Sequence, residues 1–366
     1  MDFAAFKGHA SAWTNDCPLT TLALALVGAG WLGSYALSFA RMLVDLARPG
    51  IPLKRFGAKK GAWAVVTGAT AGIGRDFALQ LAAAGFNIFL ASRTTSKLEE
   101  ISQEITAKFP NVKTQVHSID FSSPSADYAA LGKAMEPLDI GVLINNVGKS
   151  YEEPTFFQDL PDQDIADIVE INVNATLKVT KLVLPGMISR KRGLILSVGS
   201  FASLIPSPLL AVYSGSKAFL STWSQALGSE LKGTGVEVEL LNTYFVVSKL
   251  SKIRRSSWMI PTPKTYVRTC WDTFQLSRFS IRMLNHLLVG SVLSHIGVKG
   301  GAVGQPHIST PYHGHAPVQV RRSPWVVDHL FSHQFWLNYN RKLHLDIRRR
   351  ALRKRERDAG KAVKGA

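Results

Sequence analysis

Residues 61–85 limit the fold of this chain more than any other segment, because they read GAWAVVTGATAGIGRDFALQLAAAG. A β-branched apolar run leads into a glycine turn, and an amphipathic helical pattern follows until Gly85. A second apolar run, NIFLAS, comes directly afterwards. The order of strand, turn, helix and strand predicts the first unit of a parallel α/β sheet.

The glycine turn has the properties of a dinucleotide site. Gly68, Gly72 and Gly74 have no side chains, so the backbone can turn tightly and approach a pyrophosphate. The exposed amides at the start of the following helix attract the charge of that group. We expect Thr70 and Ile73, which lie in the same turn, to contact the nucleotide as well. A glycine triplet alone is weak evidence, and its value here comes from the predicted strand on either side.

The end of the second strand indicates which nucleotide binds. Where an NAD-binding unit places Asp or Glu, about 20 residues after the glycines, this chain has Ser92 and Arg93. A carboxylate there would repel a 2′-phosphate, whereas a guanidinium can bind it through charge-assisted hydrogen bonds. The pair therefore favours NADPH over NADH. The alternative is an exposed arginine without a ligand.

Two later strands also end in short polar residues. VHSIDFSS ends a strand at Asp120, and GVLINNVG ends another at Asn145, Asn146 and Gly148. Open α/β sheets bind ligands at the carboxyl ends of their strands, so these residues are candidate ligand contacts. Taken singly, each of them could equally be a turn former.

Asn172, Ser200, Tyr213 and Lys217 form the strongest chemical signal in the chain. Tyr213 and Lys217 stand four residues apart in a helical stretch, so both project from one face of the helix. A free tyrosine has a pKa of about 10 and holds its proton too firmly for acid catalysis at neutral pH. A nearby ammonium stabilises the phenolate and lowers that pKa. Ser200, at a strand end, can hydrogen-bond a substrate carbonyl and stabilise its developing negative charge.

Five separated motifs, among them TGATAGIG, NNVG and YSGSK, stand in order at compatible spacings. Over residues 61–250 the chain resembles the short-chain dehydrogenase/reductase family. The resemblance implies that Tyr213 protonates a carbonyl oxygen, while Lys217 lowers the pKa of this tyrosine and holds the nicotinamide ribose. It also implies that Ser200 orients the substrate, that Asn172 holds a water of a proton relay, and that a reduced nicotinamide supplies hydride. The alternative, a tyrosine and lysine on a helix surface without a role, leaves the coincidence of motifs unexplained.

The same resemblance assigns further cofactor contacts. It implies that Asp120 contacts the adenine and Asn146 the ribose side, and that Val246 and Ser248 contact the nicotinamide. The chain departs from the common pattern in LLNTYFVVSKL, where Thr243 and the tyrosine after it replace a Pro-Gly pair. The backbone that receives the carboxamide is therefore expected to have a different shape. A valine in NNVG, where alanine is usual, should matter little.

The N-terminal region predicts a membrane anchor. Residues 20–40 contain no charged side chain, and about 20 apolar residues are enough to span a bilayer. Six basic residues lie in 41–60 and a single lysine precedes the span, so the positive-inside rule puts the main body in the cytosol. We therefore expect a lumenal tail over 1–19, a transmembrane helix over 20–40 and a basic cytosolic linker over 41–60. A cleaved signal peptide and a buried core helix are the alternatives.

The chain after residue 250 divides into a predicted substrate region with membrane-proximal helices, 251–340, and a basic tail, 341–366. The first opens with SKIRRSSWMIP, a basic run beside an apolar patch. Such a pair suits a ligand with an anionic head and a long hydrocarbon tail, or equally a loop that faces a membrane. The apolar stretch 281–298 is short and interrupted, which favours a core or interfacial helix over a second span.

The basic tail carries eleven Lys and Arg against three Asp and Glu, a net +8 of the +17 of the whole chain. Attraction to anionic lipid headgroups explains this charge, and nucleic acid is not an expected partner because no binding module or aromatic stacking series accompanies it. No metal site is expected, since the histidines of the last third lack the spacing and the cysteine partners of one. Cys17 and Cys270 lie far apart and do not predict a disulfide.

Three segments, SKIRRSS, STPYHGHA and LHLDIRRRALRKRERD, resemble the microsomal 3-oxoacyl-CoA reductases of very-long-chain fatty-acid elongation, especially the fungal ones. The resemblance implies a single doubly wound Rossmann-type α/β domain with a parallel sheet, anchored in the ER membrane, that reduces a long-chain 3-oxoacyl-CoA with NADPH. Other elongation enzymes are then expected partners, and family members usually pair as homodimers. The alternatives are a reductase of a steroid, of the 17β-hydroxysteroid type, or of another lipid ketone, and a catalytically idle membrane scaffold.

Overall fold

The computed structural model describes residues 18–47, 52–248, 250–257, 260–275 and 333–364. The chain divides into two units, Met1–Arg48 and Pro49–Ala366. The described part of the first unit is one helix, α2 (Pro18–Ala47), and the described strands all belong to the second unit. Cys17 and the helix predicted over 281–298 lie outside the described residues.

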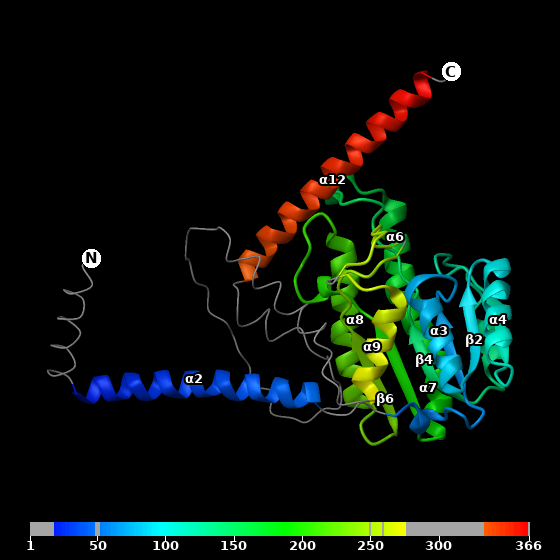
Figure 1. Ribbon diagram of the computed structural model, residues 1–366, viewed down its shortest axis with the longest axis horizontal. Coiled ribbons are helices and arrows are strands. Elements are labelled where there is room, and N and C mark those ends of the chain that lie inside the picture. The colour runs from blue at the N-terminus through cyan, green and yellow to red at the C-terminus, as the bar shows by residue number, and fades with distance from the viewer. Residues whose placement is uncertain (1–17, 48–51, 249, 258–259, 276–332, 365–366) are drawn as a thin grey trace. The chain divides into compact units, whose positions relative to one another are not determined.

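Six parallel strands form the centre of the second unit, in the order β3-β2-β1-β4-β5-β6 (Figure 1). The strands are β1 (Trp63–Thr67), β2 (Asn87–Ser92), β3 (Thr114–Ser118), β4 (Ile140–Asn145), β5 (Gly193–Val198) and β6 (Val236–Leu241). The chain moves outward from β1 in one direction and then, from β4, in the other. This order confirms the predicted doubly wound sheet, whose ligand crevice lies where the direction changes.

Helices cover both faces of the sheet (Figure 1). One layer contains α3 (Gly72–Ala84), α4 (Thr95–Lys108) and α9 (Pro263–Gln275), and the other contains α5 (Tyr128–Met135), α7 (Ala175–Ser189) and α8 (Ala211–Glu230). Successive strand residues point to opposite layers, as Val65 and Val66 of β1 do. Because both faces of the central strands are buried, β1, β2, β4 and β5 are nearly continuous apolar runs, whereas β3 at the edge of the sheet is mostly polar.

Two further helices adjoin the crevice. The first, α6 (Asp162–Val169), continues through a π-helical turn, Glu170–Asn174, into α7. Such π turns are rare and occur often at functional sites. The second, α12 (His333–Lys364), begins before the boundary of the predicted basic tail at 341.

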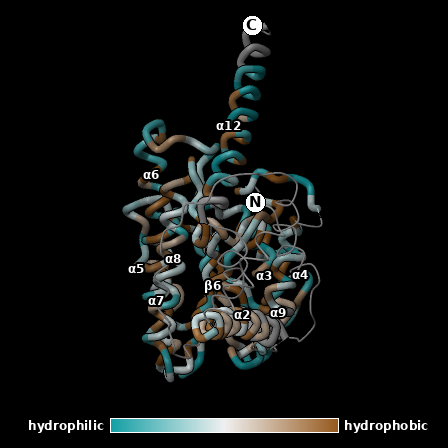
Figure 2. The backbone as a smooth tube through the Cα atoms, turned by 90° about the vertical axis from the view of Figure 1, so that its left-hand side faces the viewer, coloured by the Kyte–Doolittle hydropathy of each residue, from teal (hydrophilic) through white to brown (hydrophobic). Residues whose placement is uncertain are grey.

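The tail is helical because its arginines, lysines, leucines and alanines are good helix formers. Asp346 also pairs with Arg350 one turn later at 2.8 Å. Figure 2 shows α12 as mostly hydrophilic, with apolar positions recurring along it.

The folded domain begins before residue 61, where the sequence placed its boundary. A short 3₁₀-helix, Leu53–Phe56, lies inside the predicted linker, and the side chains of Leu53 and Phe56 are 4% and 1% exposed. Both pack in the core layer of α3 and α4. The end of the predicted linker is therefore part of the second unit.

Helix α2 contains the stretch predicted to span a membrane. It exposes a series of large apolar side chains, namely Leu19, Leu22, Leu24, Leu26, Val27, Trp31, Leu32 and Leu37. Within the part of the chain that the structure describes, however, no helix is both long and apolar enough to cross a membrane. The helix is confirmed, and a membrane span over 20–40 stays a prediction.

Candidate active site

A cavity of about 760 Å³ is lined by residues at or just after the ends of all six strands. Twelve of the predicted site residues line it: Gly68, Thr70, Gly72, Ile73, Arg93, Asp120, Asn146, Ser200, Tyr213, Lys217, Val246 and Ser248. The predicted nucleotide and catalytic groups therefore share one space. Gly74 and Asn172 are not part of the lining and act from behind it.

Two glycines of the turn are required for different reasons. Gly72 has a φ of +57°, a conformation that costs other residues more, so its backbone requires glycine. Gly74 is required by space, because a Cβ atom there would overlap the carbonyl oxygen of Gly68 and the side-chain amide of Asn146. The first turn of α3 can thus pack closely against the ends of β1 and β4, which leaves its amides available to a phosphate.

Asn146 holds the glycine turn in place. Its backbone amide donates to Thr67 Oγ1 at 3.0 Å, and its Nδ2 donates to the carbonyl oxygens of Thr67 at 3.0 Å and Gly68 at 3.2 Å. Thr67 Oγ1 also accepts from the amide of Val147 at 3.1 Å. The contact between Asn146 and a ribose stays a prediction. Sequence reasoning missed Thr67, although it is the polar last residue of β1.

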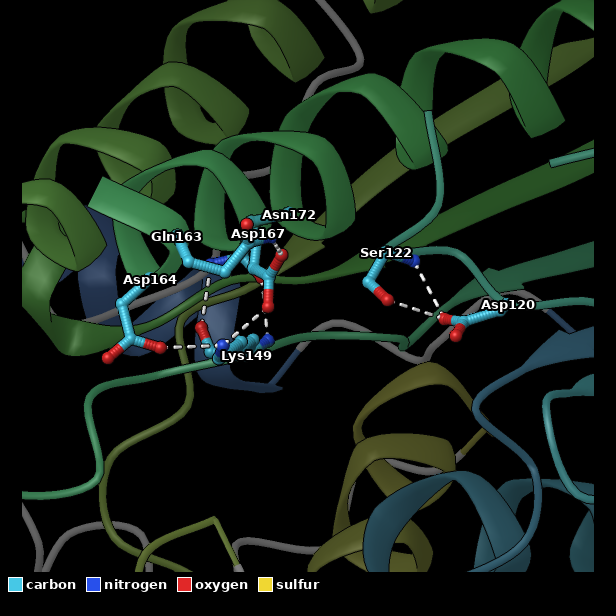
Figure 3. Close-up of polar contacts among 7 residues, drawn as sticks. All are labelled: Asp120, Ser122, Lys149, Gln163, Asp164, Asp167 and Asn172. Carbon is cyan, nitrogen blue, oxygen red and sulfur yellow. Dashed lines mark hydrogen bonds and ion pairs between the residues drawn. The ribbon is translucent and has the colours of Figure 1, made fainter. Parts of the chain in front are cut away.

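The candidate adenine and 2′-phosphate pocket lies beside the end of β2. The hydroxyls of Thr70 and Ser92 are 3.4 Å apart, and Ser118 Oγ donates to the carbonyl oxygen of Arg93 at 3.1 Å. Asp120 Oδ1 accepts from the amide and the hydroxyl of Ser122 at 2.9 and 2.7 Å (Figure 3). These bonds, the hydroxyl bond first, lower the pKa of Asp120, so it is a carboxylate at neutral pH.

Tyr213 and Ser200 meet in the wall of the cavity. Ser200 is the N-cap of the 3₁₀-helix Phe201–Ser203, and its Oγ accepts from the amide of Ala202 at 3.2 Å. Burial raises the pKa of Tyr213, and a hydrogen bond with Ser200 opposes this rise. The phenol is therefore protonated at neutral pH, as a proton donor must be. The effect that the resemblance assigned to Lys217 stays a prediction.

Lys217 is 5% exposed and lies one helical turn after Tyr213. Its Nζ donates to the carbonyl oxygen of Val198, the last residue of β5, at 2.8 Å and lies 5.9 Å from the centre of the Tyr213 ring. Burial lowers the pKa of Lys217 to about 8. The side chain is thus mostly an ammonium at pH 7, and it is directed at the end of β5 next to the tyrosine.

Asn172 is fully buried in the π-helical turn. Its Oδ1 accepts from the amide of Lys149 at 2.8 Å, and its Nδ2 donates to the carbonyl oxygen of Lys149 at 3.0 Å (Figure 3). The same Nδ2 also donates to Ser216 Oγ at 2.9 Å. Ser216 Oγ in turn donates to the carbonyl oxygen of Tyr213 at 2.7 Å. Asn172 therefore connects the loop after β4 with the catalytic turn of α8, and its role in holding a water stays a prediction.

Lys149 is a site residue that sequence reasoning missed. Its Nζ bonds Asp164 and Asp167 of α6, each at 2.7 Å (Figure 3). Burial lowers the pKa of Lys149, but the hydrogen bonds to the two carboxylates outweigh it and the pKa is raised. The ion pairs fix α6 to the loop after β4 and so support the position of Asn172.

The loop after β6 differs from the family pattern in a way that adds a contact. Thr243 Oγ1 lies 2.6 Å from the hydroxyl of Tyr266 in α9 and donates to the carbonyl oxygen of Leu241 at 3.2 Å. The carbonyl oxygen of Thr243 accepts from the amide of Phe201 at 2.9 Å, next to Ser200. A proline could make no side-chain bond there, so the threonine ties this loop to α9.

The C-terminal helix supplies part of the cavity wall through Asn340, Leu343, His344, Ile347 and Ala351. The sequence did not predict this, because most of these residues belong to the basic tail that was expected to be attracted to anionic lipid headgroups. Among the described residues, no group of three or more His, Cys, Asp or Glu side chains could hold a metal ion. Cys270 is a buried free thiol of α9.

Comparisons with known proteins agree with this geometry. The sequence pattern described as short chain dehydrogenase matches residues 62–257. A very-long-chain 3-oxoacyl-CoA reductase from Coprinopsis cinerea is 50% identical over 343 residues, which cover 93% of this chain and 93% of that relative.

Solved structures have the same fold. One, from a study of 7beta-hydroxysteroid dehydrogenase stereoselectivity, has a TM-score of 0.55 and 25% identity, with 65% of this chain and 94% of that chain covered. Another, a metagenomic short-chain oxidoreductase in complex with NADP, has a TM-score of 0.51 and 25% identity over 60% of this chain and 93% of that chain. The similarity to solved structures thus covers the Rossmann-type unit, whereas the similarity to the fungal relative extends over nearly the whole chain.

Proposed function

This chain belongs to the short-chain dehydrogenase family, and from that premise we propose that it reduces a long-chain 3-oxoacyl-CoA to the 3-hydroxyacyl-CoA with NADPH. The observation that carries the proposal is the 50% identity, over 93% of both chains, with a very-long-chain 3-oxoacyl-CoA reductase. A cavity that joins a nucleotide cradle to a tyrosine, a serine and a lysine supports it.

The residues of the cavity fit NADPH. The first turn of α3 has no room for a side chain at Gly74 and offers backbone amides to the pyrophosphate. Arg93 lines the cavity beside Thr70 and Ser92, where a 2′-phosphate would meet a guanidinium and two hydroxyls instead of a carboxylate. NADPH, when bound, supplies the hydride that reduction of a ketone needs.

Side chains of the protein would bind and protonate the oxygen atom of the ketone. Reduction forms a C–H bond at C3 of the substrate and an O–H bond at its oxygen, and the carbonyl π bond breaks. Tyr213 gives the proton to this oxygen from its phenol, and Ser200 donates a hydrogen bond that orients the carbonyl. The ammonium of Lys217 stabilises the phenolate left on Tyr213.

An assay with purified full-length protein in detergent tests the proposal. We would follow NADPH oxidation with a long-chain 3-oxoacyl-CoA, with a steroid ketone and with NADH in parallel. Turnover of the acyl-CoA with NADPH, and much less with NADH, supports the proposal. Turnover of the steroid alone keeps the chemistry and contradicts the substrate. Bound NADPH without reduction of any ketone would favour an idle scaffold.

We further propose a location in the ER membrane, with α2 as the single anchor and the catalytic unit in the cytosol. The absence of charge over 20–40, the exposed leucines of α2 and the six basic residues of 41–60 support it. The protein should then remain in the pellet after extraction of membranes with alkaline carbonate, and release into the supernatant would contradict an anchor. Association with other elongation enzymes and pairing as a homodimer stay predictions.

A further inference from the structure

One face of α12 belongs to the catalytic cavity. Leu343, Ile347 and Ala351 follow one another at intervals of four residues, so they lie in one stripe along the helix. All three line the same cavity as Tyr213. The stripe is apolar although α12 is strongly basic, and the neighbouring Leu352, which is 39% exposed, is not part of the lining.

Specific contacts hold this face against the core. His344 Nδ1 lies 2.8 Å from the carbonyl oxygen of Pro208, in the segment between β5 and α8. His344 is 6% exposed, and its burial lowers its pKa despite that bond, so the neutral ring donates through Nδ1. The contact places α12 over a segment whose Ser207 and Leu210 also line the cavity.

Two arginines attach α12 to the loop between β4 and α6. Arg348 pairs with Asp159 at 3.3 Å and lies over the ring of Phe156, 5.0 Å from its centre. Arg355 pairs with Glu153 at 2.9 Å and less closely with Glu152 at 3.4 Å. Arg348 lies between Ile347 and Ala351 in sequence, and Arg355 lies one turn after Ala351. The charges of α12 therefore hold the helix along the stripe while Leu343, Ile347 and Ala351 line the cavity.

We propose that the stripe of Leu343, Ile347 and Ala351 is the wall that binds the hydrocarbon chain of the substrate and sets the preference for chain length. The stripe extends about 12 Å along the helix axis, long enough for contact with many methylene groups. Apolar side chains in a cavity favour an apolar ligand. Because this cavity also contains the proton donor, the ligand of the stripe is assigned to the substrate rather than to a separate partner. The inference rests on the proposed function, because it concerns the acyl chain of that substrate.

The test compares two substrates that differ only in chain length. For wild type and variants, kcat/KM is measured with a short and a long 3-oxoacyl-CoA, and NADPH binding is measured as a control for folding. In Ile347→Ala we expect the ratio of the long-chain to the short-chain value to fall about tenfold. Leu352→Ala removes the same number of carbon atoms from the solvent side of the same helix and should leave the ratio unchanged.

A second variant adds bulk instead of removing it. Ala351→Trp should lower the same ratio, because the indole fills the space of the hydrocarbon chain. This variant keeps the test available if Ile347→Ala fails to bind NADPH. An equal loss of kcat/KM with both chain lengths, or an equal change of the ratio in Leu352→Ala, would contradict the proposed role of the stripe. If the wild type reduced neither substrate, the proposed function would be wrong, and the wall would then be tested by calorimetry of long-chain against short-chain acyl-CoA binding to the same variants.

Discussion

The nucleotide end of the cavity is held together by neighbouring strands, whereas the substrate end is held by side chains from segments far apart in the sequence. At the nucleotide end, Asn146 bonds Thr67 and Gly68, and these residues end or follow the paired strands β1 and β4. At the substrate end, His344 meets a residue 136 positions away, and Arg348 meets one 189 positions away.

The difference separates two properties of the enzyme. Strand pairing fixes the nucleotide cradle regardless of what the C-terminal region does, so cofactor binding should tolerate changes in the substrate wall. The wall, in contrast, depends on a few polar contacts, each of which contributes about 1 kcal/mol. Substrate preference can therefore change while the cofactor site stays the same, and four substitutions test this separation.

Tyr213→Phe should have the largest effect. The change removes the proton donor and leaves the ring, so we expect kcat to fall about a thousandfold or more. NADPH affinity should change little, since the cradle around Gly74 and Arg93 is untouched. Stopped-flow or steady-state NADPH oxidation, together with fluorescence titration of NADPH, measures both. Wild-type turnover by this variant would show that another group donates the proton.

Arg93→Glu should have the converse effect. It replaces a cation with an anion where the 2′-phosphate is proposed to bind, so the KM for NADPH should rise about a hundredfold. The KM for NADH should rise much less, and kcat at saturating NADPH should stay close to the wild-type value. Lys97→Glu makes a similar charge reversal at an exposed position of α4 outside the cavity lining and is the matched control. Equal losses in both variants would indicate a general electrostatic effect.

Gly74→Ala tests how closely the nucleotide end is packed. The added methyl group would overlap the backbone of Gly68, so a strand or a helix must move. We expect a loss of about 1–3 kcal/mol in the free energy of unfolding and weaker NADPH binding. Gly215→Ala, in α8, is the control: apart from the neighbouring residues and the backbone of the same helix, nothing lies within 4 Å of its added methyl group, and the helix should gain up to about 1 kcal/mol. Chemical denaturation measures the free energy of unfolding of both variants, and fluorescence titration measures their NADPH binding.

Sequence reasoning could bring the residues assigned to the nucleotide end together for a physical reason. The carboxyl ends of parallel strands always meet at one edge of the sheet, so Arg93, Asp120 and Asn146 could be assigned to one site without knowledge of the packing. Tyr213 and Lys217 could be paired because helix geometry fixes neighbours four residues apart. Local rules were sufficient in both cases.

The substrate end could not be predicted in this way. Leu343, Ile347 and Ala351 do recur at helical spacing, but the surrounding basic residues favoured a tail attracted to anionic lipid headgroups. Only the fold shows that this face meets the cavity. The ion pairs of Lys149 with Asp164 and Asp167 are similar, because nothing in the spacing of a lysine and two aspartates shows that a loop folds back on a helix.

Tyr266→Phe should have the smallest effect and tests whether side chains also hold the loop after β6. The hydroxyl of Tyr266 faces Thr243 at 2.6 Å, and burial raises the pKa of this tyrosine well above its usual value. Loss of the bond should reduce the free energy of unfolding by about 1 kcal/mol and lower kcat several-fold, because the loop that Thr243 begins also contains Val246 and Ser248.

Tyr128→Phe is the matched control for this last prediction. Its hydroxyl is buried and has no hydrogen-bond partner among the described residues, so its removal should leave stability unchanged or raise it. The ring, over which Lys178 lies, is retained in the variant. If both tyrosines gave the same small change, the Thr243 bond would contribute nothing to the loop. A loss in Tyr266→Phe alone would show that a side-chain contact from α9 also holds the loop after β6.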